Sequence, residues 1–95
     1  MECREFVFSG HAIRRMFERA IKTEYVKDVI GSGEIIADYP DDLPYPSFLM
    51  LGMAGGRPIH VVVAIDEDKG RCYIVTAYIP ESKLWGPDFR TRSES

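Results

Sequence analysis

Residues 58–79 read PIHVVVAIDEDKGRCYIVTAYI, and this stretch decides the fold. Two β-branched runs, residues 58–66 and 71–79, flank a polar segment in which Gly70 can take the positive φ that a tight turn needs. Runs this rich in valine and isoleucine are typical of strands covered on both faces. We therefore predict a β-hairpin whose first strand, residues 58–66, is central in a sheet and whose second strand, residues 71–79, is stopped by Pro80.

Two further strands are predicted upstream of this hairpin. They are residues 33–39 (GEIIADY) and residues 47–53 (SFLMLGM). The segment PDDLPYP between them is rich in proline and aspartate and is expected to be a loop. Because short loops join antiparallel neighbours, the four strands should form an antiparallel meander.

The residues before the strands predict two helices. Ser9 is a good N-cap for the first, because its hydroxyl can accept from free amides of the first turn. The expected buried face of this helix is Ile13, Met16, Phe17 and Ala20. The second helix should open at Thr23 and end at Gly31 or Gly33.

The expected fold class is thus α+β, with two N-terminal helices packed on one face of a four-stranded antiparallel meander sheet. The 95 residues fit one domain, residues 1–95, with an ordered core of about residues 4–90. A chain of this length has a thin core, so we expect its stability to be modest or shared with a partner.

Charge and cysteine content bear on location and partners. The net charge is −3, but the acidic residues gather in residues 34–68, which hold one basic and seven acidic side chains. Both ends are slightly basic, so a local positive surface can exist if they meet. Cys3 and Cys72 form no CxxC pair and are expected to be reduced thiols. With no membrane-spanning stretch or signal peptide, we expect a cytoplasmic protein without membrane contact.

Three residues are candidates for acid–base chemistry. His11 lies in the first turn of the first predicted helix, His60 in the third strand, and Tyr78 near the end of the fourth. The hairpin should bring His60 and Tyr78 to one edge of the sheet, and its register decides whether they share a face. Each histidine has two interpretations: a proton-transferring or phosphate-binding group, or a packed residue satisfied by a neighbour.

Arginines on the first helix are candidates for phosphate binding. Arg14, Arg15 and Arg19 can donate bidentately to phosphate oxygens, or they can form a solvated face with an Arg14–Glu18 pair. Trp85 is either a core residue or a base-stacking platform.

No phosphate-binding loop, dinucleotide fingerprint, GxSxG or CxxC motif occurs, and the acidic loop lacks metal-ligand spacing. We therefore expect no metal and no cofactor. A cofactor-free reaction that uses histidine, arginine and tyrosine remains, and metal-independent RNA cleavage fits that set.

The motifs HAxxRMxER, GRPxHVVxA and VTAYxP, together with GEIIADYPDD and PSFLMLG, resemble a bacterial family of small proteins catalogued as a domain of unknown function. The family is similar in outline to RelE/ParE-like toxins of toxin–antitoxin pairs, small α+β domains of which several cut messenger RNA without a metal. The resemblance implies a RelE-like fold, RNA as substrate and an antitoxin-like protein partner. The positions that the resemblance marks are His11, Arg15, Met16, Glu18, Arg19, His60, Thr76, Tyr78, Trp85 and Arg92. Of these, we expect His11, His60 and Tyr78 to be catalytic and Arg15, Arg19 and Arg92 to bind phosphate or RNA.

Three hypotheses follow. The first is a toxin-like, metal-independent endoribonuclease. The second is a non-catalytic protein-binding module that uses a sheet edge or its tail. The third is another cofactor-free enzyme acting on a small substrate. Convergence of His11, His60, Tyr78 and an arginine on one cleft would favour catalysis, whereas a buried His60 satisfied by the backbone would favour the binding module.

Overall fold

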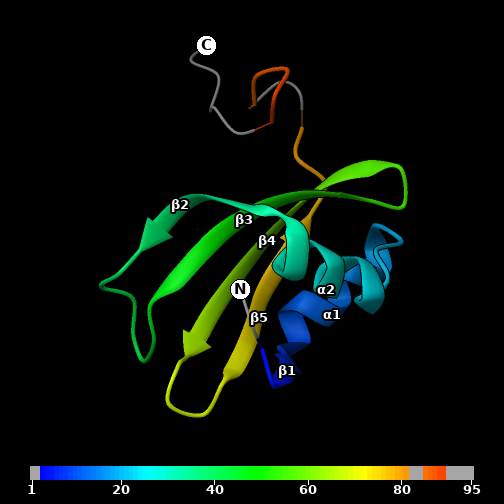
Figure 1. Cartoon of the computed structure of the whole chain (residues 1–95). Coiled ribbons are helices and arrows are strands. Elements are labelled where there is room, and N and C mark those ends of the chain that lie inside the picture. The colour runs from blue at the N-terminus through cyan, green and yellow to red at the C-terminus, as the bar shows by residue number, and fades with distance from the viewer. Residues whose placement is uncertain (1–2, 82–84, 90–95) are drawn as a thin grey trace.

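The computed structural model describes residues 3–81 and 85–89 and contains two helices and one five-stranded sheet (Figure 1). In chain order the elements are β1 (Glu5–Phe8), α1 (Gly10–Glu18), α2 (Thr23–Ser32), β2 (Glu34–Tyr39), β3 (Ser47–Ala54), β4 (Arg57–Asp66) and β5 (Arg71–Tyr78). The strand order across the sheet is β1-β5-β4-β3-β2. The prediction of a central strand at residues 58–66 is therefore confirmed by β4, whereas β5, the last strand of the expected meander, also lies inside the sheet, between β4 and β1.

The predicted four-stranded antiparallel meander is wrong, because the sheet has a fifth strand and is mixed. β1 pairs with β5 in parallel, with Phe6 opposite Cys72 and Phe8 opposite Ile74, while all the other pairs are antiparallel. Parallel neighbours need a long connection, and here both helices and three strands lie between β1 and β5 along the chain. A run of four residues gives too weak a signal for so distant a pairing.

The same parallel pairing corrects the expectation of two reduced thiols. Cys3 lies just before β1, and Cys72 lies in β5 next to it. The two residues form a disulfide with their Cα atoms 5.7 Å apart. Sequence spacing could not indicate this bond, because the contact exists only once β1 has joined the sheet.

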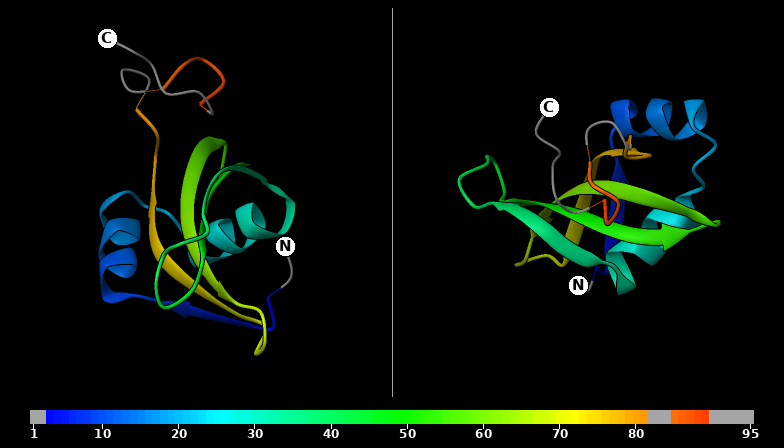
Figure 2. Two further views of the ribbon diagram at one scale, coloured as in Figure 1. Left: turned by 90° about the vertical axis from the view of Figure 1, so that its left-hand side faces the viewer. Right: turned by 90° about the horizontal axis from the view of Figure 1, so that it is seen from above.

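Both helices pack against one face of the sheet. The views in Figures 1 and 2 place α1 beside β5 and α2 against β3 and β4. Alternate residues of β4 point to this face and are nearly or fully buried: Ile59, Val61, Val63 and Ile65. They share one core cluster with residues of both helices. The remaining β4 side chains, His60 among them, point to the opposite face.

The face by which α1 docks differs from the predicted one. Ala12 and Met16 are buried, but the side chains of Ile13 and Phe17 are 55% and 88% exposed. Ala20 lies after the end of the helix with a φ of 54°. The apolar stripe of this helix is wider than the narrow row that touches the sheet, so periodicity overestimated the buried face.

Tight turns and caps hold the elements in place. Gly55 and Gly56 form the turn between β3 and β4 with positive φ values of 60° and 76°. Ser9 is the N-cap of α1, as predicted: its hydroxyl oxygen accepts from the amide of Ala12 at 3.0 Å. α2 begins at Thr23, also as predicted.

Candidate functional site

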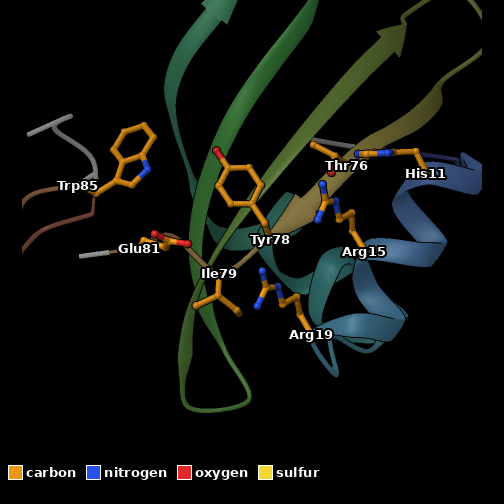
Figure 3. A pocket seen from close by; sticks show the side chains of 8 residues that line it. All are labelled: His11, Arg15, Arg19, Thr76, Tyr78, Ile79, Glu81 and Trp85. Carbon is orange, nitrogen blue, oxygen red and sulfur yellow. The ribbon is translucent and has the colours of Figure 1, made fainter. Parts of the chain in front are cut away.

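A pocket of about 340 Å³ lies where α1 meets the end of β5 (Figure 3). Its lining residues come from α1 and the residue that follows it, from β5, and from the segment after β5: His11, Arg15, Arg19, Thr76, Tyr78, Ile79, Glu81 and Trp85. His11, Arg15 and Arg19 are spaced four residues apart, so they form one row along the helix. The pocket therefore has one wall built from a histidine and two guanidinium groups.

Two sets of hydrogen bonds fix this wall relative to the sheet, one from Ser9 to β5 and one from Arg57 of β4. At the start of α1, the Ser9 amide donates to the carbonyl of Ile74, and the Ser9 hydroxyl donates to the carbonyl of Val75 at 3.0 Å. At the other end, Arg57 donates to the carbonyls of Arg19 at 2.9 Å and Ala20 at 2.8 Å. β1 pairs with β5 only as far as Ile74. The remaining residues of β5, 75–78, are therefore left for α1 to cover.

The cations of this wall have little compensation from neighbouring carboxylates. Arg15 lies 3.7 Å from Glu18, and both side chains are 47% exposed. An exposed pair of this kind contributes little free energy and does not hold the guanidinium in one place. Glu18 thus contacts Arg15 and not Arg14, with which the sequence suggested a pair. Because the contact is weak, Arg15 remains available to an anion in the pocket.

Tyr78 separates the two ends of the pocket. Figure 3 shows His11, Arg15 and Arg19 reaching from α1 on one side of the Tyr78 ring, with Glu81 and Trp85 on the other. The Tyr78 hydroxyl points away from both arginines. The pocket is therefore cationic at the end near α1, and aromatic and acidic at the end near Trp85.

His60 is not part of the pocket lining, but it contacts Tyr78, which is. His60 and Tyr78 are directly paired across β4 and β5, so their side chains share a face, which answers the question of register. The imidazole is completely buried, and its Nε2 lies 2.7 Å from the carbonyl oxygen of Phe89. A carbonyl can only accept, so Nε2 carries the proton and Nδ1 accepts from the Tyr78 hydroxyl at 3.2 Å.

The environment of His60 favours the neutral imidazole. Burial lowers the pKa of His60, and the hydrogen bond to the Phe89 carbonyl opposes this only in part. The ring of Trp85 stands nearly perpendicular to that of His60, with centroids 4.5 Å apart. His60 is thus a neutral group that joins Tyr78, Trp85 and Phe89.

The sequence-predicted residues divide into three groups. His11, Arg15, Arg19 and Tyr78 line one pocket. Among the described residues, His60 is not part of the pocket lining, but it contacts two residues that are, Tyr78 and Trp85. Arg92 lies outside the described residues.

Sequence reasoning missed two residues that matter here. Glu81 lines the pocket, and Arg57 fixes the end of α1. Arg57 is the second residue of GRPxHVVxA and Glu81 directly follows VTAYxP, and these positions were the available signal.

The described ranges, residues 3–81 and 85–89, bear on metal binding and on membrane insertion. Within these ranges no three His, Cys, Asp or Glu side chains gather as a metal site would require. In the acidic loop, Asp42 accepts a hydrogen bond from Ser47 at the start of β3. No helix in the same ranges is both long and apolar enough to cross a bilayer.

Fold and pocket together define a small α+β domain with a cationic pocket at the edge of a mixed sheet. A family model described as "Domain of unknown function (DUF4258)" matches residues 8–79, and the chain belongs to this family. No curated protein and no solved structure matches the chain. The match covers α1 and the pocket-lining part of β5, so the wall and the strand that faces it are both part of the family domain.

Proposed function

We propose that the protein is a metal-independent endoribonuclease whose active site is the pocket between α1 and β5. The observation that carries this proposal is the row of His11, Arg15 and Arg19 along one wall of a single pocket. Paired guanidinium groups suit the oxygens of a phosphodiester, and an imidazole beside them can accept and donate a proton.

The reaction fits the groups present. The 2′-hydroxyl of the RNA attacks the adjacent phosphorus, and His11 accepts the hydroxyl proton as the new P–O bond forms. Arg15 and Arg19 stabilise the negative charge that develops on the phosphorane oxygens. The bond to the 5′-oxygen then breaks, and this oxygen takes a proton from water in the open pocket. The hydroxide that remains takes the proton held by His11, so the enzyme returns to its starting state. The products are a 2′,3′-cyclic phosphate and a free 5′-hydroxyl.

In this proposal Tyr78 and His60 position the site. The Tyr78 hydroxyl is engaged with Nδ1 of His60, and its ring forms the pocket wall between the cationic and aromatic ends. The neutral imidazole of His60 fixes the Tyr78 ring by accepting the hydrogen bond from its hydroxyl. The acid–base role that the sequence suggested for both histidines is thus assigned to His11.

The resemblance to RelE/ParE-like toxins supports the same proposal. The chain carries a net charge of −3, so phosphate contact depends on the local row of cations rather than on the whole surface. A toxin of this kind would have an antitoxin-like protein partner. Ile13 and Phe17, exposed on the same helix, are apolar side chains that such a partner would cover.

A second candidate function is a non-catalytic protein-binding module. One observation favours it: His60, in the central strand β4, is buried and satisfied by the backbone of Phe89 and by Tyr78, as a structural histidine would be. The same pocket would then hold an acidic side chain of the partner instead of a phosphate.

Expression in a bacterial host separates the two candidates. Growth and RNA 5′ ends are followed for the wild type, for His11→Gln, and for Arg14→Gln as a matched control on the exposed side of α1. The ribonuclease proposal predicts growth arrest with new RNA ends in the wild type and Arg14→Gln, and neither in His11→Gln. Normal growth and intact RNA with soluble wild-type protein would overturn it and favour the binding module.

A further inference from the structure

The end of the pocket away from α1 has a chemistry of its own. Glu81 and Trp85 lie there, on the far side of the Tyr78 ring from Arg15 and Arg19 (Figure 3). The Glu81 carboxylate would repel a phosphate, because both are negatively charged. A ligand that fills the whole pocket must therefore be anionic at one end and carry hydrogen-bond donors and a flat apolar surface at the other.

We propose that this end is a base-recognition slot for guanine, so that the pocket binds a single guanine nucleotide. The Glu81 carboxylate would accept from the guanine N1–H and exocyclic amino group, and the base would stack against Trp85. The phosphate would lie against Arg15 and Arg19. This inference rests on the proposed function, because it names the nucleotide held at the same site.

Guanine fits Glu81 better than the other bases do. A carboxylate offers only acceptors, with two oxygens side by side. Guanine presents two donors next to each other on its Watson–Crick edge, so both oxygens are used. In adenine and cytosine a ring nitrogen acceptor adjoins the amino donor and faces the second oxygen, and in uracil two carbonyls flank the one N–H. Recognition of single-stranded RNA commonly combines such edge contacts with stacking on aromatic side chains.

Trp85 is held in place for stacking. His60 packs nearly perpendicular to the indole at a centroid distance of 4.5 Å, and it is itself fixed by Phe89 and Tyr78. The indole is only partly buried, so part of it faces the pocket. A pocket of about 340 Å³ is at the small end of ligand sites, which run from roughly 300 Å³ upward, and so suits one nucleotide.

The experiment uses the full chain and its intrinsic fluorescence. Trp85 is the sole tryptophan of the sequence, so quenching of its emission reports stacking directly. The four nucleoside 3′-monophosphates are titrated separately into the wild type, Glu81→Gln and the control Glu24→Gln, whose substitution lies on α2. The readout is the ratio of dissociation constants between nucleotides, because removing a negative charge from the pocket raises affinity for every phosphate.

We expect guanosine 3′-monophosphate to bind at least about tenfold more tightly than the other three, as a bidentate base contact allows. The preference should persist in Glu24→Gln and disappear in Glu81→Gln. Equal affinities for all four nucleotides, or an unchanged preference for guanine in Glu81→Gln, would overturn the proposal that Glu81 recognises guanine.

The outcomes for the slot and for catalysis are distinguishable. Guanine preference without RNA cleavage would support the slot and contradict the ribonuclease. RNA cleavage without any guanine preference would support the ribonuclease and contradict the slot.

Discussion

The hydroxyl of Tyr78 donates to Nδ1 of His60 across 3.2 Å, at directly paired positions of β5 and β4. Through Nε2, the same imidazole donates to the carbonyl of Phe89 at 2.7 Å. One buried side chain thus joins the sheet, the wall of the candidate site and the segment that carries Trp85. This arrangement makes His60 important to the site without placing it in the pocket.

Replacing Tyr78 with phenylalanine should lower the free energy of unfolding by about 1–2 kcal/mol, because Nδ1 of a buried imidazole loses its donor. Urea denaturation followed by circular dichroism measures the change. Tyr39→Phe is the matched control, since Tyr39 lies on β2 with 43% of its surface exposed. Equal losses in the two variants would show that the hydrogen bond adds nothing to stability.

Stability should fall as the pH drops below neutrality. Burial lowers the pKa of His60 in the folded state, while an unfolded histidine titrates near its ordinary value of about 6.5. Below pH about 6.5 the unfolded chain therefore binds more protons than the folded one. The contribution of neutral His60 is complete above that pH and is lost as the pH falls through the folded pKa.

Comparison with a variant that lacks His60 separates the effect of His60 on the pH dependence of stability from the effect of the carboxylates. Free energies of unfolding are measured from pH 5 to 8 for the wild type and His60→Gln. The slope between pH about 7 and 5 should be smaller in His60→Gln than in the wild type. A wild-type slope retained in His60→Gln would contradict the assignment.

The turn between β3 and β4 offers a matched pair of glycines. A Cβ at Gly55 would lie 2.7 Å from ring atoms of Tyr25, whereas a Cβ at Gly56 would meet nothing within 4 Å. Both residues have positive φ, so each alanine variant bears a backbone cost of roughly 1 kcal/mol. Gly55→Ala should lose clearly more stability than Gly56→Ala in thermal unfolding, and equal melting temperatures would mean that Tyr25 moves away freely.

The disulfide between Cys3 and Cys72 closes a loop with a sequence separation of 69 residues. In the chain-entropy model, closing a loop of this length stabilises the fold by about 4 kcal/mol. Cys3→Ser should therefore unfold at a markedly lower urea concentration than the oxidised wild type, and at about the same concentration as the wild type in reductant. If reductant leaves the wild type unchanged, the bond does not support the fold.

Local sequence signals predicted much of this fold. Three features lie where the sequence predicted them: the valine-rich hairpin, the N-cap Ser9 and the start of α2 at Thr23. All three depend on interactions between residues that are close together in the chain. The position of β1 and the cysteine pairing depend on contacts between residues far apart in the chain, and periodicity carries no information about those.

The candidate site could be predicted only in part for the same reason. The four-residue spacing of His11, Arg15 and Arg19 is visible in the sequence, but the partner surface that turns it into a pocket is not. Ile13 and Phe17 looked like docking residues because their type is apolar, yet the sheet edge accommodates only the narrower row of Ala12 and Met16. Glu81 gave no signal beyond its place after a strand.

Cleavage of single-stranded RNA by the purified protein in the presence of EDTA tests the central claim most directly. Wild type and Arg14→Gln should give fragments ending in 2′,3′-cyclic phosphate and 5′-hydroxyl groups, and Arg15→Gln should be slower by at least about a hundredfold. Intact RNA with folded wild-type protein, or equal rates for Arg15→Gln and Arg14→Gln, would contradict the account.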